Sequence, residues 1–104
     1  MRIMLRPQFR PDRYEIARAG TALIIDGATF DFSLLDDGEF LPREAVSSPW
    51  ITDLGVTRVG GVLQIALILP HGMRPPPETL APADIINPPD GPIILPAYDR
   101  RGTA

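Results

Sequence analysis

The chain has 104 residues, of which 44% are hydrophobic and 22% are charged, a composition typical of a single globular domain. Ten basic residues, all of them arginine, stand against thirteen acidic ones, and this excess of negative charge argues against nucleic-acid binding. The absence of cysteine excludes disulfides and thiolate sites, while thirteen prolines and nine glycines exclude an all-α fold.

The first half of the chain predicts a short strand followed by a β-hairpin. The strand covers residues 2–6 and should end at Pro7, because proline cannot donate a hydrogen bond to a strand ladder. Asp26 and Gly27 then separate two β-favouring stretches, which is typical of a two-residue hairpin turn. With this turn, Leu23 lies opposite Phe30. The alternation predicts one buried face, made by Leu23, Ile25, Phe30 and Phe32.

A second hairpin is expected around Gly60 and Gly61, since glycine readily adopts the positive φ angles of such a turn. Placing Val59 opposite Val62 sets the register of both strands. One face should then be buried, with Leu54, Val56, Leu63, Ile65 and Leu67 on it. The opposite face should be exposed and carries Thr57, Gln64 and Ala66.

The segment between the hairpins should contain little regular structure. One helical turn can begin at Pro42, and Trp50 should pack over an open edge of the sheet. These elements give about five to seven short strands. We therefore predict an all-β fold: a small antiparallel sandwich or partly open barrel built on two hairpins, with a proline-rich extended C-terminal arm.

The composition changes after Leu69, because nine of the thirteen prolines lie between Pro70 and Pro96. We therefore divide the chain into an antiparallel β domain, residues 1–69, and a proline-rich arm, residues 70–104. Proline runs favour an extended form without internal hydrogen bonds. The arm nevertheless carries apolar residues that need a surface, either on the domain itself or on a partner, and the sequence is compatible with both. The predicted partner-binding residues are Trp50, Ile85, Ile86, Ile93, Ile94 and Leu95.

No residue pattern in the chain indicates catalysis or a metal site. His71 is the sole histidine and has no obvious partner, so a surface turn is expected there. The acidic cluster of Asp36, Asp37 and Glu39 lacks the ligand spacing of a calcium loop. A single stretch of arginine and aromatic residues, 9–14, is weak support for single-strand binding. We expect no enzyme activity, no cofactor, no metal and no nucleic-acid partner.

The chain resembles small proteins encoded in the tail and tail-fibre regions of phages and prophages of alphaproteobacteria. The matching features are Asp26-Gly27, Leu41-Pro42, Trp50-Ile51, Leu69-Pro70-His71-Gly72 and Leu95-Pro96. None of these is a catalytic motif. The resemblance implies a structural role in the virion or in its assembly.

These observations lead to one functional expectation and two alternatives. We expect a non-enzymatic phage tail accessory or tail-fibre assembly protein that contacts other tail proteins or copies of itself. The alternatives are a small intracellular protein-binding module without a virion role, and a hydrolase that uses His71. The longest apolar run, 65–69, is too short to span a bilayer, so no membrane partner is expected. We expect synthesis in the host cytoplasm, with incorporation in the virion tail left open.

Overall fold

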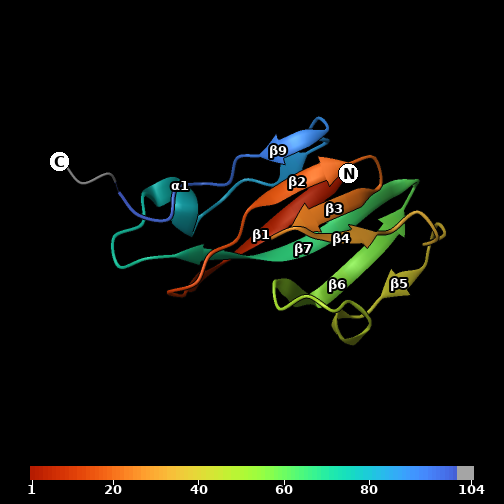
Figure 1. Cartoon of the computed structure of the whole chain (residues 1–104), viewed down its shortest axis with the longest axis horizontal. Coiled ribbons are helices and arrows are strands. Elements are labelled where there is room, and N and C mark those ends of the chain that lie inside the picture. Colours follow the sequence, from red (N-terminus) through yellow and green to blue (C-terminus); the bar gives the residue numbers. More distant parts are fainter. Residues whose placement is uncertain (101–104) are drawn as a thin grey trace.

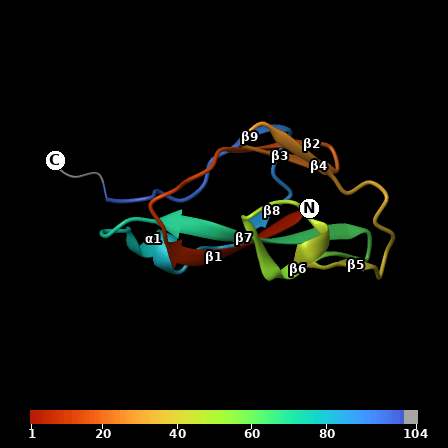
Figure 2. The same ribbon diagram turned by 60° about the horizontal axis from the view of Figure 1, so that its bottom comes forward.

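The computed structural model describes residues 1–100, which form two β-sheets and two short helical turns (Figure 1). The first sheet has the order β5-β6-β7-β1-β8, with β5 at Phe40–Leu41, β6 at Ile51–Val59, β7 at Val62–His71, β1 at Arg2–Phe9 and β8 at Ile85–Ile86. The second has the order β4-β3-β2-β9, with β4 at Ala28–Asp31, β3 at Ala22–Ile25, β2 at Ile16–Ala19 and β9 at Gly91–Ile93. The two sheets form separate layers (Figure 2), which confirms the predicted sandwich.

The first predicted hairpin is confirmed as β3 and β4. Asp26 and Gly27 form its turn with φ angles of 50° and 81°, and Leu23 lies opposite Phe30 as expected. Two positive φ values in succession are the mark of a type I′ turn, whose twist matches that of the flanking strands. The predicted core residues of this hairpin are buried, except that Phe30 is only partly covered because β4 lies at the edge of its sheet.

The second hairpin is confirmed as β6 and β7, with Val59 opposite Val62. The prediction for Leu54 is wrong, because this side chain is 45% exposed. A bulge interrupts β6: Ile51 pairs with Leu67, while Val56 pairs with Ile65. The positive φ of Gly55, 65°, belongs to this bulge and changes the face to which the preceding residues point.

Ala66 is the second correction in this hairpin. It was expected on an exposed face, yet it is fully buried. It lies in the middle of β7, the central strand of the first sheet, where neighbouring strands and their side chains cover a small methyl group.

Strand β1 corrects the expectation of a purely antiparallel fold. It continues through Pro7 to Phe9 and pairs in parallel with β7 along its whole length, so the first sheet is mixed. Proline is tolerated here because β8 pairs only with Arg2 and Ile3, which leaves the outer edge of the rest of β1 without a strand partner.

The arm packs on the same chain. Strand β7 runs to His71, so the boundary drawn at residue 69 falls inside a strand. Strand β8 then adds to the first sheet beside β1, and β9 adds to the second sheet beside β2. The end of the described arm returns to its beginning, where the Gly72 amide donates to the Tyr98 carbonyl at 2.9 Å. Residues 101–104 of the predicted arm lie outside the described residues.

The remaining segments form two short helical turns. The turn predicted at Pro42 is the 3₁₀ helix η1, Arg43–Ala45. The arm contains α1, Pro77–Leu80, whose Thr79 is fully buried and donates its hydroxyl to the Ala97 carbonyl at 2.6 Å. This bond joins two parts of the arm that are 18 residues apart.

Candidate protein-binding groove

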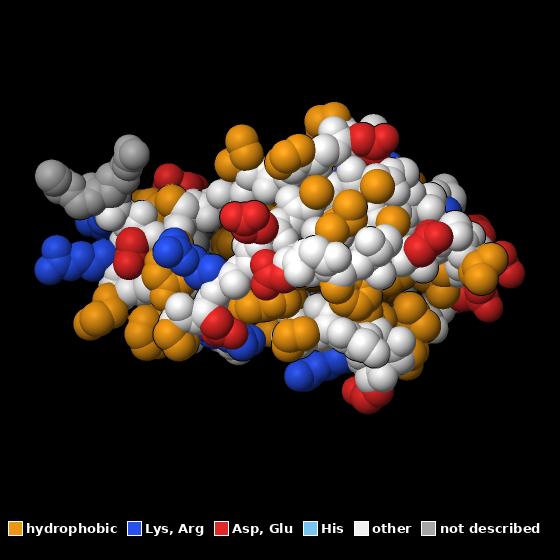
Figure 3. All heavy atoms as spheres, in the orientation of Figure 1, with side chains coloured by type: hydrophobic (Ala, Val, Ile, Leu, Met, Phe, Trp, Pro, Cys, Tyr) orange, Lys and Arg blue, Asp and Glu red, His pale blue; other side chains and the backbone are white. Residues whose placement is uncertain are grey.

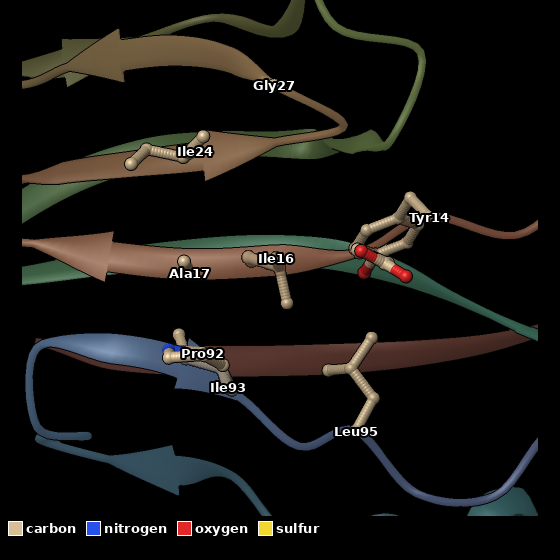
Figure 4. Close-up of a pocket in the computed structure, with 9 residues that line it drawn as sticks. Tyr14, Ile16, Ala17, Ile24, Gly27, Pro92, Ile93 and Leu95 are labelled. Atoms are coloured by element: carbon tan, nitrogen blue, oxygen red, sulfur yellow. The ribbon is translucent and has the colours of Figure 1, made fainter.

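A mainly apolar hollow lies on the second sheet, where β2 meets β9 (Figure 4). Its volume is about 500 Å³. We call it the β2–β9 groove, and it is lined by Tyr14, Glu15, Ile16, Ala17, Ile24, Gly27, Pro92, Ile93 and Leu95. The first sheet lies behind this part of the second sheet in Figure 4, so the groove opens on the outer side of the sandwich.

The groove exists because two paired strands separate. Ile16 pairs with Ile93, but the residues beyond this pair continue along different paths. On one side, Glu15 turns towards the hairpin turn: its carbonyl accepts from the Asp26 amide at 2.9 Å, and its own amide donates to Asp26 Oδ1 at 2.9 Å. On the other side, the chain leaves β9 towards Leu95. Tyr14 and Leu95 thus stand on either side of the gap (Figure 4).

The floor of the groove is apolar. Ala17 lies opposite Ile24 on one side and opposite Pro92 on the other, so these three side chains share the outer face of the sheet. Ile94, directly after β9, is 92% exposed. A cluster of exposed apolar side chains on one face is typical of a surface that contacts another molecule.

Two of the six predicted partner-binding residues line this groove. Ile93 and Leu95 line the groove, and Ile94 lies between them in the chain. Ile85 and Ile86 are elsewhere, in β8 of the first sheet, where Ile86 is 68% exposed. These two residues therefore belong to a different surface.

Trp50 does not present a surface to a partner, because it is only 5% exposed. The Tyr14 ring lies 4.5 Å from its ring, and the Arg10 guanidinium lies over it at 4.4 Å. Its backbone carbonyl accepts from the Ile68 amide at 2.8 Å. Trp50 thus supports Tyr14 from the interior and holds one wall of the groove in place.

Tyr14 is a neutral hydrogen-bond donor at physiological pH. Its hydroxyl donates to the Ile68 carbonyl at 2.8 Å. Burial raises the pKa of Tyr14 well above its ordinary value, and the negative charge of Asp26 raises it further. The wall that Tyr14 forms therefore does not ionise in the neutral range.

Other residues considered from the sequence make local contacts. Asp37 accepts from the Gly61 amide at 2.8 Å, so the acidic loop caps the second hairpin. His71 Nδ1 lies 2.8 Å from the Gly72 carbonyl oxygen. Arg10 pairs with Asp12 at 2.7 Å. Within residues 1–100, no group of three or more histidine or acidic side chains is arranged to hold a metal ion.

One residue of the groove that was not predicted, Ile24, could have been identified from the sequence. Ile24 is apolar although its neighbours Leu23 and Ile25 already point to the core, so its side chain had to face outward. No sequence pattern indicates that Tyr14 and Pro92 line the same groove, because they come close together only when β9 of the arm pairs with β2.

Comparison of the chain with protein-family models, with curated proteins and with solved structures finds no match. Among residues 1–100, no helix is long and apolar enough to cross a membrane.

Proposed function

We propose that this protein is a non-enzymatic accessory or assembly protein of a phage tail or tail fibre, and that it acts through protein–protein contacts. The observation that carries the contact role is the β2–β9 groove, together with the exposed Ile94, which lies in the chain between the lining residues Ile93 and Leu95. The resemblance of Trp50-Ile51, 69–72 and Leu95-Pro96 to proteins of tail gene regions supports the setting.

Two properties of the groove favour binding: apolar surface that a partner can cover, and a wall that is already held in place. Covering an exposed isoleucine contributes about 1.5–3 kcal/mol from removal of apolar surface from water. The wall formed by Ile93 and Leu95 is already held by pairing between β9 and β2 and by the prolines on either side. Less conformational entropy is therefore lost when a partner docks.

The groove can be tested with one variant and a matched control. Ile94→Asp places a charge between two residues that line the groove, whereas Met73→Asp alters another exposed apolar residue, 85% exposed, outside the groove. Both should fold, because both positions are open to water. We expect the first variant to lose co-purification with tail proteins and the second to retain it. Equal retention by both would contradict a role for the groove.

The tail setting is tested on purified particles by mass spectrometry. A structural component should be present at a fixed number of copies per particle. Protein that is absent from particles but needed for their formation would identify an assembly factor. Normal, infectious particles from a strain that lacks the gene would contradict the proposal.

A further inference from the structure

Strand β4 forms one edge of the second sheet, and β9 forms the other. Ile25 pairs with Ala28 next to the type I′ turn, and Leu23 pairs with Phe30. In such a hairpin, the two residues of each of these pairs form hydrogen bonds with each other. The residues between them on β4 therefore direct their backbone N–H and C=O groups away from β3. Thr29 and Asp31 therefore present N–H and C=O groups outward, and within residues 1–100 no backbone hydrogen bond is formed there.

Proline or short length protects β9, the open part of β1, β5 and β8, whereas β4 has neither protection. Strand β9 contains Pro92, and the open part of β1 contains Pro7. Strands β5 and β8 have only two residues each. Proline and short length are common means of preventing a sheet edge from pairing with another chain. Strand β4 has four residues and no proline, so its edge remains able to accept a strand.

A second hollow, of about 360 Å³, lies along this edge. We call it the β4 cleft, and it is lined by Thr29, Phe30, Asp31, Phe32, Leu41, Ala45, Val46 and Ser47. The cleft separates β4 from the segment that contains β5 and η1. Phe30 is only partly buried at this edge. A strand added to β4 would point alternate side chains into the cleft, towards Phe30, Leu41 and Val46.

The surface around the cleft is acidic, which favours a basic partner. Residues 26–44 contain one arginine against six acidic residues, a net charge of −5 compared with −3 for the whole chain. Figure 3 shows acidic side chains gathered at the end of the molecule that carries the loop between β4 and β5. Asp31 is exposed and lines the cleft itself, and the exposed Glu44 directly precedes the lining residue Ala45. Hydrogen bonds from Ser33 hold the pKa of Asp31 below its ordinary value, so this carboxylate is charged at neutral pH.

This charge disfavours a second copy at the same edge. A copy that paired its own β4 here would bring an equally acidic segment into contact, and like charges across an interface oppose association. A segment rich in arginine or lysine is favoured instead.

We propose that the β4 cleft binds an extended basic segment of a partner protein, which adds to β4 as a further strand and places an apolar side chain in the cleft. The backbone of Thr29 and Asp31 supplies the hydrogen bonds, while Asp31 and Glu44 attract the basic side chains. This surface is distinct from the β2–β9 groove, and its test does not depend on a role in phage tails.

The test uses synthetic peptides with blocked ends and the full-length protein. One peptide has the sequence Lys-Val-Arg-Val-Lys-Val-Arg, and its control replaces every basic residue with glutamate. Amide hydrogen exchange is measured by NMR. We expect the basic peptide to slow exchange at Thr29 and Asp31 by about tenfold or more, with a weaker effect at high salt, and the acidic peptide to have none.

Two substitutions at one position separate backbone recognition from side-chain contact. Thr29→Pro removes the outward N–H without touching a hydrogen bond of the β3–β4 ladder, whereas Thr29→Val keeps that N–H. We expect the proline variant to lose peptide binding and the valine variant to retain it. Equal binding by both would overturn strand addition.

A charge substitution provides a test that does not depend on how the proline variant folds. Glu44→Lys should weaken binding of the basic peptide, while Glu78→Lys, an exposed change in α1 outside the cleft, should not. Similar binding of the basic and acidic peptides would overturn the proposal. It would also be overturned if Thr29 and Asp31 gained protection with rising protein concentration alone, because that result would identify a second copy as the occupant.

Discussion

The hairpins and the arm are both rich in apolar residues, but they reach their sheets in different ways. Strands β6 and β7 form a ladder with each other across a two-residue turn. No two strands of the described arm pair with each other, and its strand β8 pairs with residues at the opposite end of the chain, where Ile86 lies beside Arg2. Proline removes backbone donors, so a proline-rich segment must use the open edge of a sheet that already exists.

Side chains of the first half of the chain hold the arm in place. The Arg18 guanidinium donates to the Pro88 carbonyl at 2.6 Å and to the Asn87 side chain at 3.0 Å. The Gly20 amide donates to Asp90 at 3.0 Å. The hairpins are therefore held by their own ladders and buried apolar contacts, whereas the arm is held by the sheet edges that β8 and β9 join and by these separate polar contacts. Three predictions examine this difference.

The largest effect is expected in the hairpin core. Ile65 is fully buried between the sheets, and Ile65→Ala should lower the free energy of unfolding by about 2–5 kcal/mol because it removes buried apolar surface and leaves a cavity. Ile94→Ala, in the arm, should change it by about 0.5 kcal/mol or less, since this side chain already lies in water. Denaturant melts measure both. Equal losses would mean that Ile94 is also buried in solution.

The same difference explains how much of the fold the sequence predicts. Asp26-Gly27 and Gly60-Gly61 determine both hairpin registers, because a two-residue turn fixes which residues face each other. The bulge at Gly55 was missed, since one glycine inside a strand does not show how the register changes. The parallel pairing of β1 with β7 was missed as well, because it joins residues about sixty positions apart without a local turn.

The candidate site was predictable to a similar extent. Ile93 and Leu95 were identified because apolar residues between prolines need a surface. Their neighbours across the groove, Tyr14 and Ala17, become neighbours only when β9 adds to β2. Trp50 was expected over an open edge of the sheet, and the packing of its ring against Tyr14 and Arg10 depends on contacts that no local pattern encodes.

A smaller and more local effect is expected from a polar anchor of the arm. Thr79→Val keeps the shape of the fully buried side chain but leaves the Ala97 carbonyl without its donor, which should cost about 1–3 kcal/mol. The control is Thr57→Val in β6, at a half-buried position. Hydrogen exchange should then show loss of protection at the Gly72 and Arg100 amides, which donate to the Tyr98 and Arg74 carbonyls, with little change in β6 and β7. Equal loss in both regions would show that the arm and the hairpins unfold as one unit.

The smallest effect is expected at Tyr14, where the two regions meet. Its hydroxyl bonds to β7 of the second hairpin, and its ring lines the groove with Leu95 of the arm. Tyr14→Phe should cost about 1 kcal/mol at neutral pH through loss of this hydrogen bond.

The variant should also change the response to alkaline pH. The folded state raises the pKa of Tyr14, whereas an unfolded chain releases the tyrosine proton near the ordinary value of about 10. The stability that depends on this hydroxyl is therefore fully present below pH ~10 and falls as the pH rises towards the folded-state pKa. Denaturant melts from pH 8 to 11 should show this fall in the parent and a flatter profile in the variant, because phenylalanine has no proton to lose. Parallel profiles of stability against pH in the parent and the variant would mean that the Tyr14 hydroxyl is exposed to water in solution.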